Sequence, residues 1–268
     1  MSYSIFRAPF LAFLLVLVST GCKEKTATEI AAESVGQDTL RILSYNIHHG
    51  AGMDLKLDLE RIAKLIKDLN PDLVALQEID SVVTRTEGVN QAEVLGHLTE
   101  MHSVFGEFMP YQGGKYGMAV MSKWPILEST NNRLPDGSEP RSALGIRVTS
   151  PKTGRELHFV SIHFYETETE RLAQAQALAV AYEAVDSPVI LAGDYNSEPD
   201  SPVIAFLKEQ WGFVDKGEDH FTFSSFEPVK EIDYFALRPF EAFKVLNQFT
   251  VDEPVASDHK PIFVELAW

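Results

Sequence analysis

The distribution of apolar and polar residues divides the chain after residue 38 into segments with two different periods. In residues 58–69, DLERIAKLIKDL, apolar side chains recur every three or four positions, which predicts an amphipathic helix capped by Asp58. Thr167 and Glu170 are spaced as a capping box at the start of another such segment. The further helices are predicted over residues 91–102, 168–184 and 201–209.

Short apolar runs with a different spacing predict β-strands. These runs read LRILSYNI, DLVALQE, KYGMAVMSKWPI, SALGIRVTS, LHFVSIHF and SPVILAGD. The turn sequence PKTGRE joins SALGIRVTS to LHFVSIHF as a hairpin, and the unbroken run SPVILAGD predicts a strand that is buried on both faces. Hairpins mixed with strand–helix units favour an α/β fold of two packed mixed β-sheets with helices on the outside.

The first 22 residues have the pattern of a secretion signal. MSYSIFRAPFLAFLLVLVSTGC carries one early cation, Arg7, then an apolar stretch that is short for a spanning helix, then small residues. STGC resembles a bacterial lipobox, and Cys22, the single cysteine of the chain, stands where a lipid would be attached. The alternative is ordinary signal cleavage with an incidental thiol. We predict a signal peptide over 1–21, the lipid-attachment cysteine with a flexible tether over 22–38, and one folded domain over 39–268.

Composition and charge narrow the range of partners. The chain has 268 residues, 45% of them hydrophobic, which suits one large globular domain. The formal net charge of −16 becomes −17 when Arg7 leaves with the signal peptide. Such an acidic chain is not expected to carry a long nucleic-acid track, because that requires clustered Lys and Arg. We expect a monomer that is tethered through Cys22 to a membrane of the bacterial cell envelope and faces the periplasm or the exterior.

Polar residues stand at or near the ends of several apolar runs. Each of them alone has an ordinary explanation, such as a turn, a helix cap or a core histidine. Gathered at the ends of several buried strands, they predict a site on a rigid scaffold. The residues are Asn46, Glu78, His163, Asp194, Asn196, Asp233, Asp258 and His259.

Three of these residues predict a metal site. Asn46, Glu78 and Asp258 offer only hard oxygen ligands, which favour Mg²⁺, or Mn²⁺, over Zn²⁺. A divalent cation of this kind neutralises charge on the oxygens of a phosphate that is transferred to water.

The other five residues supply the remaining needs of such a reaction. Asp194 can accept the proton of the attacking water, and the amide of Asn196 can orient that water or donate to a phosphoryl oxygen. A charged His163 or His259 would stabilise the developing negative charge. Asp233 would hold His259 in its donating tautomer, as carboxylates do for imidazoles.

The ordered set of motifs resembles the endonuclease/exonuclease/phosphatase superfamily. The matching segments are SYNIHHG, ALQEID, YGMAVMSKWPI, SIHF, LAGDYNSEP, EIDYF and SDHKPI, which lie between residues 41 and 266. The resemblance implies a four-layer α/β sandwich and a Mg²⁺-dependent enzyme whose catalytic domain is residues 39–268. It places Asn46, Glu78 and Asp258 at the metal. The roles that it implies for the rest are Asp194 as general base with Asn196 beside it, Asp233 paired with His259, and His163 as phosphate ligand or acid.

Two arginines in loops after strands have a second, open interpretation. Arg85 in SVVTRTEG and Arg141 in EPRSAL can each grip a phosphate in a fork, or can form ordinary surface ion pairs. His48 and His49, which follow Asn46 closely, are assigned to a turn.

Three functions remain for comparison. The first is a metal-dependent phosphodiesterase or phosphatase that acts outside the cytoplasm on a small-molecule, lipid or sugar phosphoester. The second is a secreted or tethered nuclease of the same fold, which the acidity of the chain disfavours. The third is an inactive, lipid-anchored binding protein, which the complete set of site residues disfavours.

Overall fold

The computed structural model describes Met1 and residues 39–268. Cys22 and the predicted tether lie outside the described residues, as does the signal peptide apart from Met1. Residues 39–268 form one compact unit. Within the part that the structure describes, no helix is both long enough and apolar enough to cross a membrane.

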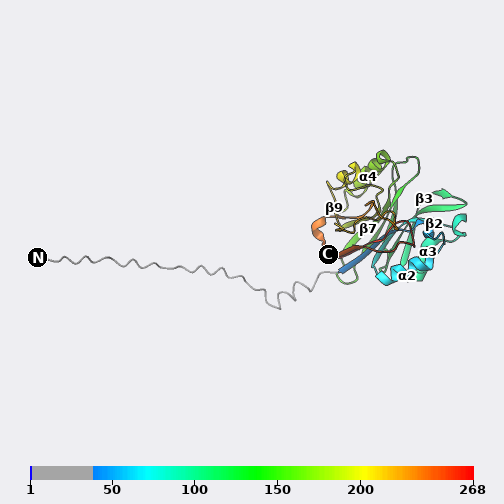
Figure 1. Ribbon diagram of the computed structural model, residues 1–268, viewed down its shortest axis with the longest axis horizontal. Coiled ribbons are helices and arrows are strands. Elements are labelled where there is room, and N and C mark those ends of the chain that lie inside the picture. Colours follow the sequence, from blue (N-terminus) through cyan, green and yellow to red (C-terminus); the bar gives the residue numbers. More distant parts are fainter. Residues whose placement is uncertain (2–38) are drawn as a thin grey trace. The chain divides into compact units, whose positions relative to one another are not determined.

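Two six-stranded β-sheets form the centre of this unit (Figure 1). Both are mixed sheets, because β1 runs parallel to β2 and β7 runs parallel to β8, whereas the other pairs are antiparallel. The first sheet has the order β11 (Lys244–Thr250), β12 (Ile262–Ala267), β1 (Thr39–Asn46), β2 (Leu73–Ser81), β4 (Gly114–Ser122), β3 (His102–Tyr111). The second has the order β5 (Glu128–Arg133), β6 (Ser142–Thr149), β7 (Glu156–His163), β8 (Val189–Asp194), β10 (Asp233–Arg238), β9 (Gly212–Phe213).

Helices cover the outer faces of both sheets, with α4 on the opposite side from α2 and α3 (Figure 1). α2 (Leu59–Leu69) and α3 (Gln91–Thr99) pack on the first sheet, and α4 (Glu168–Tyr182) and α5 (Pro202–Leu207) pack on the second. Short 3₁₀ turns follow β1 (η1, His48–Gly50), β2 (η2, Thr84–Thr86) and β10 (η3, Phe240–Ala242).

The structure confirms some of the predicted helix ends and corrects others. Asp58 caps α2 by accepting a hydrogen bond from the backbone N–H of Arg61 at 2.9 Å. α3 ends at Thr99, earlier than predicted, because the chain turns there and enters β3. The capping box at α4 is absent: the Thr167 hydroxyl donates to the Glu170 carboxylate, which accepts from the backbone N–H of Ser138.

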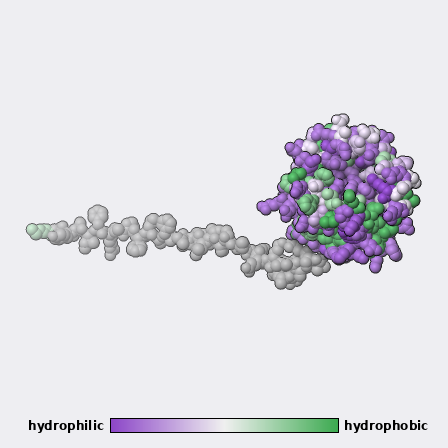
Figure 2. All heavy atoms as spheres, turned by 45° about the vertical axis from the view of Figure 1, so that its right-hand side comes forward, coloured by the Kyte–Doolittle hydropathy of each residue, from purple (hydrophilic) through white to green (hydrophobic). Residues whose placement is uncertain are grey.

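Apolar side chains fill three separate layers. One cluster lies between the two sheets, one between the first sheet and α2 with α3, and one between the second sheet and α4 with α5. All six residues of β8 are buried, as its unbroken apolar run predicts. The four-layer α/β sandwich is confirmed. The face shown in Figure 2 is mostly hydrophilic, with apolar residues in separate patches.

Candidate active site

Strand direction explains why the polar residues of the first sheet meet. β1 and β2 are parallel, so Asn46 and Glu78 reach the same edge of the sheet at their carboxyl ends. β12 is antiparallel to β1, and Ser44 pairs with Ile262. The segment that enters β12 therefore brings Asp258 to this edge.

The second sheet repeats this arrangement. His163 and Asp194 are register partners at the carboxyl ends of the parallel strands β7 and β8. β10 runs antiparallel to β8, so its first residue, Asp233, pairs with Asp194. His259, on the loop before β12, forms an isolated bridge with Phe223 and completes this side of the site.

A β-bulge turns Glu78 out of the regular alternation of β2. The pairing of β2 with β4 shifts between Gln77 and Ile79, and Glu78 has a left-handed φ of 59°. Gln77 stays buried and donates across the sheets to Ser161 Oγ at 3.0 Å. Bulges commonly redirect a side chain beside an active site, at a backbone cost of about 1–3 kcal/mol for a non-glycine left-handed residue. The bulge places the Glu78 side chain on the cavity wall.

Asn46 connects the two sheets at the site. Its Nδ2 donates to Glu78 Oε1 and to Asp194 Oδ2, both at 3.2 Å. Its Oδ1 accepts from the backbone N–H of His48 at 3.1 Å. The Ser257 hydroxyl donates to the Asn46 carbonyl at 2.7 Å, which fixes the loop that carries Asp258 against β1.

Asp233, His259 and Asp194 form a buried chain of three side chains. His259 Nδ1 lies 3.0 Å from Asp233 Oδ2, and because a carboxylate accepts, Nδ1 carries the proton. His259 Nε2 lies 3.6 Å from Asp194 Oδ2. The ring of Phe223 lies 4.9 Å from the imidazole, centroid to centroid.

The charges in this chain suit proton transfer near neutral pH. Burial raises the pKa of Asp194 to about 7, against the opposing effect of His259. Burial alone would lower the pKa of His259, but Asp233 and Asp194 outweigh it and raise that pKa to about 10. His259 is therefore cationic at pH 7, and Asp194 titrates close to the pH at which a general base is most effective.

His163 differs from His259 in charge. Its Nε2 lies 3.4 Å from Asp194 Oδ2. Burial lowers the pKa of His163 well below its usual value, and the nearby charges of Arg141 and His259 lower it further. A neutral imidazole can donate a hydrogen bond to a phosphate but is a poor proton donor. The pKa therefore favours the ligand role for His163 over the acid role, and leaves the cationic role to His259.

Asn196 lies next to Asp194, where the motif places it. Its backbone N–H donates to Asp194 Oδ1 at 2.8 Å, and its Nδ2 donates to the Phe164 carbonyl at 2.9 Å. The residue has a φ of 49° and lines the cavity. One hydrogen of the side-chain amide is thus bonded within the protein. The second hydrogen and Oδ1 are left for the predicted role in orienting water.

The oxygen atoms of Glu78, Asp258 and Asn46 fit a hard divalent cation. Burial raises the pKa of Glu78, and repulsion from Asp258 raises it further, although the hydrogen bond from Asn46 opposes both. Among the described residues neither carboxylate pairs with Lys or Arg, and Glu78 accepts a hydrogen bond from the Asn46 amide. Two neighbouring carboxylates without a cationic partner are stabilised by a bound cation. Asn46 turns Nδ2 toward Glu78 while its Oδ1 accepts from His48, so a role of Asn46 as a metal ligand stays a prediction.

Arg85 and Arg141 line the same cavity, but each also has a carboxylate partner. Arg85 makes a fork to Asp80, with Nε–Oδ2 at 2.7 Å and Nη2–Oδ1 at 2.9 Å. Arg141 is buried, and its Nη1 donates to Glu139 and to the Pro140 carbonyl. Both arginines thus form ion pairs, that of Arg141 at a buried position, and their role in binding phosphate stays a prediction.

The cavity that joins these residues has a volume of about 940 Å³. Of the predicted residues, it is lined by Glu78, His163, Asp194, Asn196, Asp258 and His259, together with the two arginines. Asn46 and Asp233 lie behind this wall and hold the others through hydrogen bonds. The structure therefore brings all eight strand-end residues to one place.

Sequence reasoning missed the residues that hold the site in shape. Ser257 stands beside Asp258 in SDHKPI, and its position in that motif was the available signal. Gln91 is buried at the start of α3 and connects β2 to the turn after β1. Nothing in the local pattern distinguishes Gln91 from an ordinary first-turn residue.

A sequence model of the Endonuclease/Exonuclease/phosphatase family matches residues 43–259. The chain belongs to this family. The match contains every strand-end residue of the site, and it confirms the resemblance of the motifs. Members of the endonuclease/exonuclease/phosphatase family hydrolyse phosphoester bonds and generally use divalent metals.

The chain is also similar to individual proteins in sequence or in fold. Uncharacterized protein YbhP of Escherichia coli (strain K12) is 29% identical over 171 residues, which are 60% of this chain and 68% of YbhP. A functionally unknown conserved protein from Enterococcus faecalis V583 has a TM-score of 0.72 at 20% identity, over 85% of this chain and 99% of its own. The mannosyl-6-phosphatase Bt3783 of Bacteroides thetaiotaomicron VPI-5482 has a TM-score of 0.69 at 19% identity, over 85% and 100%. The two structural likenesses concern the fold.

Proposed function

We propose that this protein is a Mg²⁺- or Mn²⁺-dependent hydrolase of a small-molecule, lipid or sugar phosphoester. The observation that carries the proposal is the buried chain Asp233–His259–Asp194, which shares one cavity with Glu78 and Asp258. A proton acceptor, a cation and a pair of carboxylates suited to a metal are the parts that phosphoryl transfer to water requires.

Each side chain has a defined part in this proposal. The divalent cation, held by Asn46, Glu78 and Asp258, would neutralise charge on the phosphoryl oxygens. Asp194 takes the proton of the attacking water, and cationic His259 donates a hydrogen bond to the phosphoryl group from Nε2. His163, Asn196 and the two arginines bind the phosphate or the water, and Asp233 keeps the proton of His259 on Nδ1.

The shape and charge of the cavity favour a small substrate over DNA or RNA. Its volume of about 940 Å³ is in the range of small-molecule sites. A long polyanion would meet repulsion from the acidic rim, whereas a compact phosphoester with a neutral remainder would not. A sugar phosphate is one such compound, as the name of the Bacteroides phosphatase illustrates. The rim carboxylates are those of Glu139, Glu166, Glu168, Glu198 and Asp200, and they outnumber the further lining cations Arg171 and Lys230.

Removal of divalent metal is expected to abolish activity. Purified protein should hydrolyse at least one member of a panel of aryl phosphomonoesters, aryl phosphodiesters, sugar phosphates and phospholipids in Mg²⁺ or Mn²⁺. EDTA should stop the reaction, and added Mg²⁺ should restore it, because the oxygen donors favour hard ions. Gels with DNA and RNA test the nuclease alternative. Full activity in EDTA would exclude the metal role, and a panel without turnover would favour the binding-protein alternative.

Glu78→Ala tests the proposed Mg²⁺ ligands, and the measurement is a titration of activity with Mg²⁺. We expect the Mg²⁺ concentration for half-maximal activity to rise by about 10–100-fold, because the variant lacks a ligand that the bulge positions. Glu60→Ala, which removes an exposed carboxylate of α2, is the matched control and should leave the titration unchanged. An unchanged metal requirement in folded Glu78→Ala would remove Glu78 from the set.

We also propose that Cys22 carries lipid and holds the enzyme at the cell envelope, outside the cytoplasm. The support is the apolar segment that ends in STGC, with no other cysteine in the chain. Stable anchoring requires two or more acyl chains, and Cys22→Ser removes their attachment point. The variant should therefore move from the membrane fraction to the soluble fraction. Asp194→Asn is the control and should fractionate as the wild type. Membrane association that survives Cys22→Ser would disprove the anchor.

A further inference from the structure

The turn η1 brings two neighbouring histidines to the same side of the backbone. Consecutive residues of a strand point to opposite faces. His48 and His49 instead have left-handed φ angles of 47° and 45°, and their rings contact edge to face with centroids 4.4 Å apart. A turn that only reversed the chain would not need two adjacent histidines in this strained conformation.

Interactions with β2 and α3 fix this turn. Gln91 Nε2 donates to the His49 carbonyl at 2.7 Å, and Gln91 Oε1 accepts from the backbone N–H of Asp80 at 2.8 Å. Gly50 follows with a φ of 79°, and a Cβ there would lie 3.0 Å from Leu59 and 3.2 Å from Gln91. The turn is therefore held in one conformation before any ligand binds.

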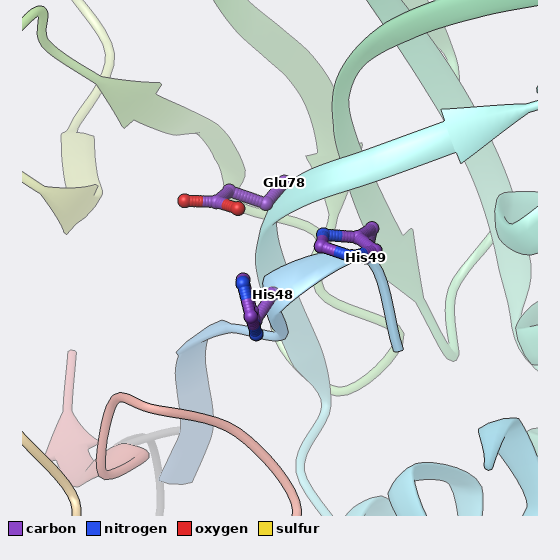
Figure 3. A group of neighbouring side chains, drawn as sticks. All are labelled: His48, His49 and Glu78. Carbon is purple, nitrogen blue, oxygen red and sulfur yellow. The ribbon is translucent and has the colours of Figure 1, made fainter. Parts of the chain in front are cut away.

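Glu78 faces the two imidazoles from the bulge of β2. Figure 3 shows the imidazole of His48 and the carboxylate of Glu78 pointing toward one another, with His49 beside them. One ligand atom from each residue lies within 4.8 Å of the other two. All three side chains are half-buried, so an ion from solvent can reach them.

The hydrogen bonds of the histidines leave nitrogen atoms for an ion. His48 Nδ1 lies 3.1 Å from the Ala51 carbonyl, and because a carbonyl only accepts, the proton of His48 is on Nδ1 and the lone pair is on Nε2. This is the usual arrangement of a metal-binding histidine, whose second nitrogen donates to a carbonyl or carboxylate. His49 Nδ1 is buried and has no hydrogen-bond partner among the described residues. A bound ion would satisfy it.

We propose that His48, His49 and Glu78 form a second metal site, the outer metal site, for a borderline divalent cation such as Zn²⁺. Two imidazoles and a carboxylate suit Zn²⁺, whereas the oxygen donors of Asn46, Glu78 and Asp258 suit Mg²⁺. Zn–N bonds of about 2.0–2.1 Å require the donor atoms to approach one another more closely than 4.8 Å. Half-exposed side chains on a fixed backbone can make this movement by small changes of their χ angles.

The outer metal site shares Glu78 with the proposed Mg²⁺ ligands. Metal binding to the outer metal site can be measured without any enzyme turnover. Its test is therefore Zn²⁺ binding, read from the histidine ring nitrogens in ¹H–¹⁵N spectra and from calorimetry. The full chain carrying Cys22→Ser is used, because this change removes the only thiol. Failure of the proposed hydrolase activity would leave this measurement unaffected.

Zn²⁺ is expected to shift Nε2 of His48 and one ring nitrogen of His49, while Nδ1 of His48 stays protonated. The double variant His48→Ala/His49→Ala should bind Zn²⁺ more weakly by over about 100-fold, since it loses two direct ligands. The matched control is His97→Ala/His102→Ala, which removes two exposed histidines and should keep the wild-type affinity. Equal affinity of the two double variants would overturn the proposal. Zn²⁺-induced shifts confined to other histidines, such as His259 of the buried chain, would also overturn it.

Discussion

Asp194→Asn is expected to lower turnover by about 10²–10⁴-fold while Mg²⁺ binding persists. The change keeps the shape of the side chain but removes the proton acceptor, and general-base catalysis contributes an effect of this size. Burial raises the pKa of Asp194 to about 7, so the folded state disfavours the ionised carboxylate. A neutral amide at this position should therefore leave Tm unchanged or raise it.

The measurement is single-turnover kinetics with a metal titration, alongside a thermal melt. Asp200→Asn is the matched control, because Asp200 also lines the cavity but is exposed and lies outside the buried chain. It should retain wild-type turnover on a small substrate. If folded Asp194→Asn turned over substrate at the wild-type rate, Asp194 would not be the base.

His259→Ala is expected to lower turnover by about 10²–10³-fold, which is the usual effect of removing one donor to a developing anion. Asp233→Ala should also be damaging, because Asp233 holds the proton on His259 Nδ1 and, after the opposing effect of burial, is foremost in raising the pKa of that imidazole. The double variant should lose less than the product of the two single losses, since the residues act as one unit.

The double-mutant cycle is measured as turnover at saturating Mg²⁺. Asp233→Asn separates position from charge, because an amide oxygen still accepts from Nδ1 but no longer stabilises the cation. We expect it to recover part of the activity that Asp233→Ala loses. Strictly multiplicative losses at positions 233 and 259 would show that the two residues act independently.

The sequence determined most of the secondary structure and which residues meet at the site. Periodicity is a local property, so helices α2 to α5 and strands β1, β2, β4, β6, β7 and β8 were predictable, and the fully buried β8 was recognisable from its unbroken apolar run. Strands β3 and β5 were not predicted. Asn46, Glu78, Asp194 and His259 were predictable because each lies in a motif at or near the end of a strand. The helix ends were less certain: Glu170 accepts from the Thr167 hydroxyl and also from the backbone N–H of Ser138, a competing donor that a distant loop supplies.

Only the tertiary structure decided how these residues are oriented and charged. Asn46 binds Asp194 across 148 positions of sequence, and no local pattern contains such a contact. The bulge that turns Glu78 toward His48 and His49 arises from the pairing of β2 with β4, which sequence reasoning did not place in register. His163 and His259 are alike in sequence, yet burial leaves one neutral and two carboxylates make the other a cation. Desolvation and long-range pairing depend on the whole fold, so these properties follow from packing and not from the motifs.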